Sequence, residues 1–536
     1  KMSIYSAVCS VEANDNKVNF IDTPGFFDFV GEVLAPLAIS SLALLVVRPG
    51  NIEVGAKRAY KFLKNTKKPV AIVVNKMDRD NSDAAKTFAN LNELFNGKCV
   101  MFDEPNANGS GFSSVNDVVD AHIDELTEKV ANCDDEIMMK FLEGEEVTAE
   151  EVKAGLPLAI QSAELIPVLF ASAEKNVGIN EIVNFITSYA PAADTIEEVN
   201  ASAPAGALVY KTIVDPFQGR ISYALVKGGQ LTPNSEMYNV NKQIKVKVGA
   251  LGMPSGKDVV PAEAVGAGDI AVITKVDTLE TNETVADASV STPYAGVKFP
   301  QPVVFFGVRV DNKNDEPKVS EGLKRASLED LTITVERIPE IKQLQVGCQG
   351  GTHIDTILNK IKTTYKCQAV TEDARVPYRE TIKGSSDVEG KHKKQSGGAG
   401  QYGDVHIRFE PLADKDFEFA SEVVGGAVPK NYFPAVEKGL IETLEHGPLA
   451  GFPVIGVRAV LFFGSYHPVD SNEISFKLAA SLAFKDAVAK LKPTILEPIM
   501  EIQVVAPNDY VGDIMGDLNK RRGRVMAMNP MEDGEQ

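Results

Sequence analysis

One stretch, from Phe20 to Phe29, constrains the fold more than any other part of this sequence. An apolar strand ends at Asp22, the turn Thr23-Pro24-Gly25 follows, and a helical pattern then runs to about Ile39. Open α/β sheets hold ligands at the carboxyl ends of their strands, so Asp22 can hold Mg²⁺ there, directly or through water. Gly25 lets a backbone N–H approach a phosphate closely. The alternative is an ordinary strand-turn-helix, because Asp-x-Pro-Gly is a common turn.

The region from residue 1 to about residue 195 alternates short apolar runs with helical patterns. The runs lie at Ile4–Cys9, Val18–Ile21, Leu42–Val47, Val70–Val74 and Leu165–Phe170. This order is typical of a mostly parallel, doubly wound sheet.

Two short polar motifs directly follow strands of this sheet. The first is Asn75-Lys76-Met77-Asp78, and the second is the dipeptide Ser172-Ala173. The tetrapeptide resembles the guanine-specificity motif Asn-Lys-x-Asp, which implies that the carboxylate of Asp78 can accept hydrogen bonds from N1–H and from the exocyclic amine of guanine together, a donor pair that adenine lacks. Asn75 can serve the other edge of the base and Lys76 can lie along it. A solvated charged loop is the competing interpretation of the tetrapeptide, and the dipeptide alone is nearly uninformative.

A phosphate-binding loop is missing from the sequence. No Gly-x-x-x-x-Gly-Lys-Ser/Thr segment occurs in the 536 residues, although such a loop supplies the phosphate cradle in this type of domain. We therefore expect that the nucleotide domain lacks its N-terminal part, and that this chain binds nucleotide poorly as it stands.

Composition limits the cellular setting. The five cysteines are odd in number and lack ligand spacing, which favours a reducing cytosol with neither a disulfide framework nor a zinc site. No apolar run is long enough to span a membrane. The net charge of −19 opposes wholesale coating of nucleic acid but leaves room for a local basic patch.

Such a patch occurs in Lys391-His392-Lys393-Lys394, which carries no acid and precedes a glycine-rich segment. Concentrated ammonium groups bind polyanion backbones by releasing counterions. Gly-rich backbone can approach a phosphate, and Tyr402 can stack on a base or simply pack. A loose surface hairpin is the alternative.

Four further domains are expected after residue 195. Short alternating runs with turn signals predict a β-barrel over residues 196–292. Strands and helices over residues 293–372 suit a ferredoxin-like sandwich, in which we assign His353 no catalytic role. The basic patch belongs to an arm over residues 373–492. A strand at Pro498–Val505 and a helix at Val511–Gly523 predict half of a last ferredoxin-like domain over residues 493–536.

Taken together, these motifs resemble the translational GTPases, and elongation factor G in particular. Asp22-Thr23-Pro24-Gly25 is similar to switch II, Asn75–Asp78 to the guanine-specificity motif, and Ser172-Ala173 to the fifth GTPase motif. The segment Gln395–Tyr402 is similar to the tip of domain IV, and Gly464–Ser471 matches another loop of that domain. The resemblance covers nearly the whole chain, in unbroken domain order, with both ends lacking.

The resemblance implies a multidomain α/β and α+β protein. Its parts would be an incomplete P-loop GTPase-type doubly wound domain, a β-barrel, ferredoxin-like domains and an S5-like α+β arm. It also implies GTP or GDP and Mg²⁺ as cofactors of the full-length protein, and a cytoplasmic monomer without a membrane anchor. The implied partners are the RNA of both ribosomal subunits, with tRNA and mRNA in the decoding region.

Specific residues follow from the same resemblance. Mg²⁺ would be held by Ser3 and Asp22. The nucleotide would be bound by Asp22, Thr23, Pro24, Gly25, Asn75, Lys76, Asp78, Ser172 and Ala173. RNA would be contacted by Lys391, His392, Lys393, Lys394, Gln395, Ser396, Gly397, Gly398, Gln401, Tyr402, His467, Lys520, Arg521 and Arg522. For the last three there is a structural alternative, since cations in a last helical turn complement the helix dipole.

One departure from the family pattern concerns catalysis. The family's catalytic His position is Phe26 here, and a phenyl ring cannot hydrogen-bond a water molecule. The implied function is GTP-dependent translocation of tRNA and mRNA on the ribosome. The alternative is a ribosome-binding paralogue with weak or no GTP hydrolysis, acting in recycling or ribosome protection. A metabolic P-loop enzyme is disfavoured by the arm and the barrel.

Overall fold

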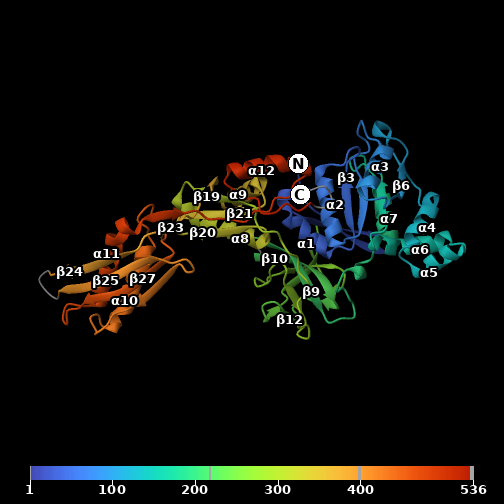
Figure 1. Cartoon of the computed structure of the whole chain (residues 1–536). Coiled ribbons are helices and arrows are strands. Elements are labelled where there is room, and N and C mark those ends of the chain that lie inside the picture. Colours follow the sequence, from blue (N-terminus) through green and yellow to red (C-terminus); the bar gives the residue numbers. More distant parts are fainter. Residues whose placement is uncertain (1, 216–218, 257, 396–399, 531–536) are drawn as a thin grey trace. The chain divides into compact units, whose positions relative to one another are not determined.

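The chain, described here from a computed structural model, divides into two compact units (Figure 1). The structure describes residues 2–215, 219–256, 258–395 and 400–530. The first unit comprises Lys1–Arg337 and Leu344–Ala374, and the second comprises Ile338–Gln343 and Arg375–Gln536. The finer division into five domains stays a prediction.

A four-stranded parallel sheet forms the centre of the nucleotide-type domain. Its strands follow the order β3 (Ala43–Val47), β4 (Val70–Val74), β8 (Ile166–Phe170) and β5 (Cys99–Met101). Successive side chains of β4 point to opposite faces, and both faces are covered. Ile72 packs with residues of α2 (Val54–Thr66) and α3 (Ala84–Leu94). Val73 packs with residues of α4 (Ile123–Ala131), α6 (Ala149–Gln161) and α7 (Ile179–Tyr189). The doubly wound architecture is therefore confirmed.

The strand that carries Asp22 belongs to a separate small sheet. β1 (Ala7–Ala13) and β2 (Asn16–Asp22) pair only with each other among the described strands, antiparallel, with Ala7 opposite Asp22. The first strand thus begins later than the predicted Ile4. The 3₁₀ turn η1 (Phe27–Phe29) and helix α1 (Gly31–Ile39) follow, so the expected strand-turn-helix order is present.

An antiparallel sheet of eight strands forms the barrel-type domain, built around the long strands β9 (Gly206–Asp215) and β10 (Gly219–Gly228). The single strand expected near Lys245–Leu251 is wrong. It is split into β13 (Ile244–Lys247) and β14 (Ala250–Ser255), because the chain changes partner strands at Gly249. A Cβ on Gly249 would lie 2.7 Å from the carbonyl oxygen of Thr274, a distance that only glycine tolerates. The other strands of this sheet are β12 (Glu236–Asn239), β15 (Asp258–Pro261), β17 (Ile270–Thr274) and β18 (Thr284–Ala286). A separate two-stranded antiparallel sheet is formed by β11 (Gln230–Leu231) and β16 (Val265–Gly266).

The last domain of the first unit has the ferredoxin-like order. Two β-α-β halves give the sheet order β20–β21–β19–β22, with helices α8 (Glu316–Glu329) and α9 (Gly351–Tyr365) in its core. Two of its strands, β20 and β22, had no clear signal in the sequence. The strands are β19 (Val304–Val310), β20 (Thr334–Ile338), β21 (Gln343–Cys348) and β22 (Ala369–Asp373).

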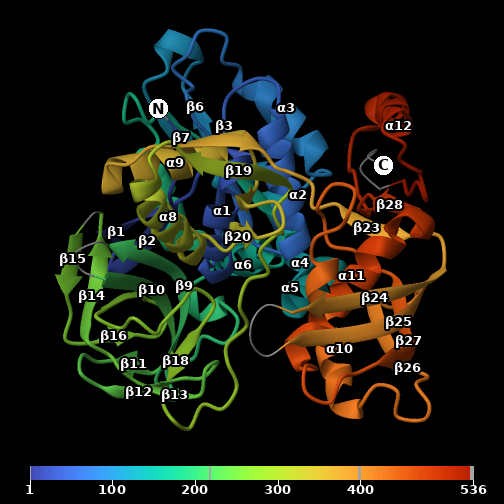
Figure 2. The same ribbon diagram turned by 90° about the vertical axis from the view of Figure 1, so that its left-hand side faces the viewer.

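In the second unit, a sheet of order β24–β25–β27–β26 packs one face against two helices (Figure 2). The helices are α10 (Phe433–Leu444) and α11 (Glu473–Leu491), and their shared core includes Phe409 and Phe476. The strands are β24 (Ser386–Lys394), β25 (Gln401–Pro411), β26 (Phe417–Ser421) and β27 (Val457–Ser465).

The end of the second unit departs from expectation. β28 (Pro493–Leu496) pairs with β23 (Arg379–Ile382), but the predicted strand Pro498–Val505 is wrong. A strand needs a neighbouring strand for its backbone N–H and C=O groups, and none in the described part of the chain pairs with this segment. Ile499 is accordingly 98% exposed. Helix α12 (Val511–Lys520) forms as predicted, with Gly523 closing it through a hydrogen bond to Leu518.

Candidate nucleotide site and basic hairpin

The loop after β4 is anchored by its one apolar side chain. Met77 is fully buried, and its N–H donates to the carbonyl of Ala171 at the end of β8 (3.1 Å). Lys76, with a φ of 69°, turns outward and is exposed. This geometry leaves Asn75 and Asp78 at the carboxyl edge of the parallel sheet, as the sequence predicts.

The structure brings the two sequence-distant motifs of this edge together. The Ser172 hydroxyl donates to Oδ1 of Asp78 at 2.6 Å, and Oδ1 of Asn75 accepts from the Ala173 N–H at 2.9 Å. Asn75 also accepts from the N–H of Lys76. The hydrogen bond from Ser172 holds the pKa of Asp78 below its usual value, so the carboxylate stays ionised at neutral pH. The side chains therefore form one ordered polar cluster with a fixed negative acceptor.

The residues predicted to hold Mg²⁺ also lie together. The Ser3 hydroxyl donates to Oδ2 of Asp22 at 3.3 Å, and both residues are exposed. Pro24 is buried, whereas Gly25 is exposed and a Cβ on it would meet nothing within 4 Å. A carboxylate and a hydroxyl are oxygen ligands of the kind that Mg²⁺ takes, so the donor set fits the ion. Thr23, which lies between Asp22 and Pro24 in the chain, is half-buried.

Phe26 occupies the position after this turn without any polar atom to offer. Its ring is 42% exposed and lies 6.2 Å from the ring of Phe29. The next residues dock onto α9 instead, since Oδ2 of Asp28 accepts from the Thr352 N–H at 3.1 Å. The ring of Phe29 meets His353 edge to face at 5.7 Å.

His353 is buried and lies beside a carboxylate of its own domain. It is 3% exposed, and its Nε2 lies 3.3 Å from Oδ2 of Asp330. Burial would raise the pKa of Asp330, but the hydrogen bonds from His353 and Thr332 outweigh it and lower that pKa. No sequence pattern pointed to this pair, because the partners lie on different elements of the domain.

A second network in this unit also went undetected in the sequence. The Nζ of Lys211, on β9, lies 2.7 Å from Oε2 of Glu32 on α1, with each side chain 12% exposed. The same carboxylate oxygen accepts from the backbone N–H and the hydroxyl of Ser6. A lysine and a glutamate far apart in the sequence carry no signal of pairing, and only the fold shows that they join the barrel strand to the helix after the Asp22 turn.

The basic patch lies at the end of the hairpin β24–β25. Lys393 and Lys394 are exposed, and no carboxylate among the described residues forms an ion pair with either. Lys391 differs, because its Nζ lies 3.4 Å from Glu389 and 3.8 Å from Asp404. His392 is half-buried, and its Nε2 lies 2.9 Å from Oε1 of Gln401. Gln395 is exposed, whereas Ser396, Gly397 and Gly398 lie outside the described residues.

A neighbouring loop is fastened to this hairpin. The Tyr402 N–H donates to the Asp470 carbonyl at 2.9 Å, and the Ser471 hydroxyl donates to the Tyr402 carbonyl at 2.8 Å. The Tyr402 ring meets His467 at 6.4 Å, and Nδ1 of His467 lies 3.2 Å from Asp470. The hairpin that carries the basic patch and the loop that carries His467, which the sequence analysis identified separately, are thus adjacent.

The three predicted RNA-binding cations near the C-terminus lie at the end of α12. Lys520 and Arg521 are exposed, and Arg521 pairs with Asp517 one turn earlier at 2.8 Å. Arg522 binds both carboxylate oxygens of Glu497, at 3.0 and 2.9 Å. The two arginines therefore have structural partners, and their contact with RNA stays a prediction.

Comparison with known proteins identifies the family. Family models match the chain in order: "Elongation factor Tu GTP binding domain" at residues 1–192, "Elongation factor G domain 2" at 204–288, "Elongation Factor G, domain III" at 299–373, "Elongation factor G, domain IV" at 374–492 and "Elongation factor G C-terminus" at 494–536. The chain is 34% identical to an elongation factor G-like protein of Thermotoga maritima, over 99% of this chain and 83% of the relative.

The chain belongs to the elongation factor G family. A crystal structure of a Thermus thermophilus protein is also similar, with a TM-score of 0.85 and 31% identity over 99% of this chain and 83% of that one. The resemblance inferred from the motifs is therefore confirmed at the level of an elongation factor G-like GTPase family. Members of a GTP-binding family use GTP or GDP with Mg²⁺, and elongation factors act on the ribosome in protein synthesis. Among the described residues, no helix combines the length and apolarity needed to cross a bilayer.

Proposed function

We propose that this elongation factor G-like protein promotes GTP-dependent translocation of tRNA and mRNA on the ribosome. The observation that carries the proposal is a pair of hydrogen bonds between the hairpin β24–β25 and the loop that contains His467. They join Tyr402 to Asp470 and to Ser471. Hydrogen bonds at both the N–H and the carbonyl of Tyr402, with the Asp470 carbonyl and the Ser471 hydroxyl respectively, would make this end of the arm stiff. A stiff element that displays Lys393 and Lys394 can push against an RNA backbone, whereas a loose hairpin would yield.

The cluster around Asp78 supports guanine-nucleotide control of this arm. Asp78 would accept from guanine, Asn75 and Ala173 would line the other edge, and Lys76 would lie along the base. Ser3 and Asp22 would hold Mg²⁺, and Gly25 would sense the terminal phosphate by its backbone N–H. Bound GTP would supply the phosphoryl group that is transferred to water. Catalysis of that transfer depends mostly on positioning the reacting groups and on electrostatic stabilisation.

The RNA contacts of the proposal come from the second unit. Exposed ammonium groups at Lys393 and Lys394 would bind phosphates, and His467 would approach tRNA in the decoding region of the ribosome. Lys520, Arg521 and Arg522 would contact RNA of the large subunit. We propose the domain boundaries already given, at residues 195, 292, 372 and 492, with the protein acting as a cytoplasmic monomer.

A second candidate function is favoured by Phe26. Its ring packs toward Phe29 and offers no donor to a water molecule. A protein with this residue would bind the ribosome but hydrolyse GTP slowly or not at all, and would act in recycling or ribosome protection.

The two candidates differ in a ribosome-stimulated GTPase assay on the full-length gene product, run beside a translocation assay on programmed ribosomes. Translocation that needs hydrolysable GTP supports the first. Ribosome binding with neither hydrolysis nor mRNA movement supports the second. Failure to bind ribosomes in either nucleotide state would contradict both.

A further inference from the structure

A cluster of ligand-type side chains lies on the face of the β24–β25 sheet that the helices leave open. The register places Glu389 opposite His406, and Lys391 opposite Asp404. Intervening residues face α11 closely: a Cβ on Gly390 would lie 2.2 Å from the Ala479 carbonyl oxygen. Because side chains alternate along a strand, the four named residues point to the other face together.

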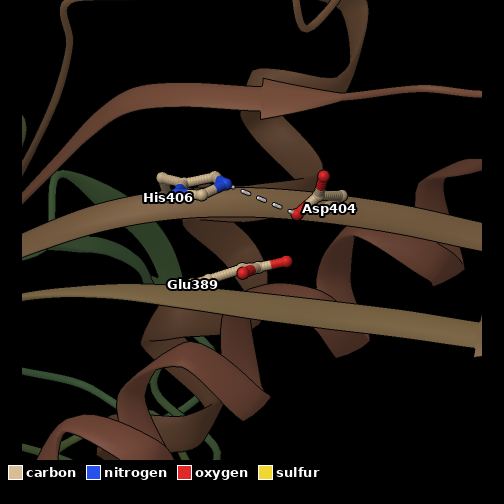
Figure 3. A group of neighbouring side chains, drawn as sticks. All are labelled: Glu389, Asp404 and His406. Atoms are coloured by element: carbon tan, nitrogen blue, oxygen red, sulfur yellow. Dashed lines mark ion pairs between the residues drawn. The ribbon is translucent and has the colours of Figure 1, made fainter.

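The ligand atoms of Glu389, Asp404 and His406 converge (Figure 3). One atom from each lies within 4.8 Å of the others, and His406 Nε2 is 3.8 Å from Oδ1 of Asp404. Bonds of roughly 2.0–2.2 Å around a tetrahedral zinc place ligand atoms about 3.4 Å apart. Small side-chain rotations on the adjacent strands β24 and β25 therefore suffice to close the site.

A second observation at this site is a buried carboxylate oxygen of Asp404 that makes no hydrogen bond within the described part of the chain. The residue is 5% exposed, although it carries a carboxylate. Its Oδ2 accepts a hydrogen bond of 2.5 Å from the Ser465 hydroxyl, but its Oδ1 is buried and has no hydrogen-bond partner among the described residues. Buried polar atoms are nearly always satisfied, because leaving one unpaired is costly. This oxygen, which makes no hydrogen bond to any described residue, is the one that lies 3.8 Å from Nε2 of His406.

We propose that Glu389, Asp404 and His406 bind a divalent transition-metal ion, with zinc as the best match. One imidazole nitrogen and two carboxylate oxygens suit zinc and its neighbours, whereas calcium and magnesium prefer oxygen alone. Three protein ligands leave a fourth position for water. The His406 ring is also held in place, edge to face with Phe463 at 5.1 Å.

Lys391 acts as the built-in competitor of the metal. Its Nζ lies 3.4 Å from Glu389 and 3.8 Å from Asp404, so an ammonium group balances the two carboxylates when no metal is bound. Metal binding would displace this ammonium toward solvent. Removing the lysine should therefore strengthen metal binding, an effect that a purely structural ion-pair network does not produce.

The test uses the whole chain after treatment with a chelator, titrated with Zn²⁺ alone by calorimetry. We expect one zinc bound per chain, with affinity falling about tenfold or more in Asp404→Asn and in His406→Ala. Lys391→Ala should bind more tightly than the wild type. His122→Ala is the matched control, because His122 and Glu125 form another histidine–carboxylate pair, at 3.6 Å. This variant should bind as the wild type does.

A second readout separates loss of the site from loss of the fold. Co²⁺ alone should give visible d–d absorption bands that disappear in His406→Ala and persist in His122→Ala. Glu389→Gln changes an exposed side chain, so it should weaken zinc binding while leaving the circular dichroism spectrum unchanged. The proposal is overturned if Zn²⁺ binds no more tightly to the wild type than to Glu389→Gln and His406→Ala, or if Lys391→Ala weakens binding.

Discussion

Gly31 faces the carboxylate of Asp330 so closely that a Cβ added to Gly31 would lie 2.5 Å from Oδ1 of Asp330. Gly31 begins helix α1, which follows the Asp22 turn, whereas Asp330 follows helix α8 of the ferredoxin-like domain. The same carboxylate accepts from Thr332 and lies beside His353, so it has little freedom to move away. The approach of these two elements thus depends on a glycine.

Substituting Gly31→Ala should destabilise the protein by about 1–3 kcal/mol, because the added methyl group overpacks a fixed carboxylate. Gly55→Ala is the matched control: it also lies in the first turn of a helix, α2, but its Cβ would meet nothing within 4 Å. That change should stabilise by about 0.4–1 kcal/mol through the unfolded state. Thermal unfolding midpoints of the two variants should therefore move in opposite directions, and a shared direction would contradict the packing argument.

Ser172→Ala should weaken binding of guanine nucleotides by about an order of magnitude, because it removes the hydroxyl that holds the Asp78 carboxylate. The readout is the dissociation constant of fluorescent GDP on the full-length protein. Ser10→Ala is the control, since Ser10 makes a hydrogen bond of the same 2.6 Å length, to Asn19, on the β1–β2 hairpin. Equal changes in the GDP dissociation constant for the two variants would contradict a specific role of Ser172 in nucleotide binding.

The polar motifs of the nucleotide domain could be predicted because they follow long apolar strands. Asn75 directly follows β4 and Ser172 lies just after β8, and the carboxyl ends of these two parallel strands meet at one edge, whereas Asp22 ends a strand of the separate β1–β2 sheet. The contact of Asp78 with Ser172 needed only that rule. The strand at Pro498–Val505 shows its limit: the apolar pattern is present, yet no described strand pairs with it.

What the sequence could not supply were contacts between distant elements. Nothing in the basic patch indicates that Lys391 is paired with Asp404 while Lys393 is not. That difference arises from strand register, which places Lys391 opposite Asp404 and Lys393 opposite Tyr402. Asp103 likewise looks like an ordinary surface acid, but it is 2% exposed in the structure.

The buried carboxyl of Asp103 should make stability depend on pH. Desolvation raises its pKa to about 8, despite the hydrogen bond that Oδ1 accepts from Phe170. The folded state therefore holds this proton more tightly than the unfolded state. The contribution of Asp103 to stability is fully present below about pH 4 and is lost as pH rises through 8. Asp103→Asn keeps the acceptor but not the charge.

We expect the Asp103→Asn variant to exceed the wild type in stability by on the order of 3 kcal/mol at pH 8.5, with the advantage shrinking toward pH 5. Unfolding midpoints measured across this range test the slope. Glu104→Gln, which removes an exposed carboxylate from the neighbouring position, should leave the wild-type slope unchanged. A slope shared by the wild type and Asp103→Asn would show that Asp103 does not cause it.

Replacing both Lys393 and Lys394 by alanine should weaken ribosome binding and reduce its salt dependence. Losing two phosphate contacts should make the plot of the logarithm of the binding constant against the logarithm of salt concentration shallower, by about 1.5 in the magnitude of its slope. Lys391→Ala should change the slope less, because carboxylates already balance that ammonium group. Binding measured at several salt concentrations tests this order. A larger change in Lys391→Ala than in the double variant would contradict it.

Phe26→His should raise ribosome-stimulated GTP hydrolysis, by about 10²-fold where proton transfer or water positioning limits the rate. The site has room for an imidazole because the Phe26 ring is 42% exposed, and its contact with Phe29 is loose at 6.2 Å. Phe27→His is the matched control: this neighbouring ring is 49% exposed and lies 4.8 Å from the Arg58 guanidinium, and residue 27 is not the family's catalytic His position. Single-turnover hydrolysis on ribosomes separates the two variants. If Phe26→His hydrolyses no faster than Phe27→His, the missing donor at residue 26 does not limit catalysis, and the slow step lies elsewhere in the nucleotide site.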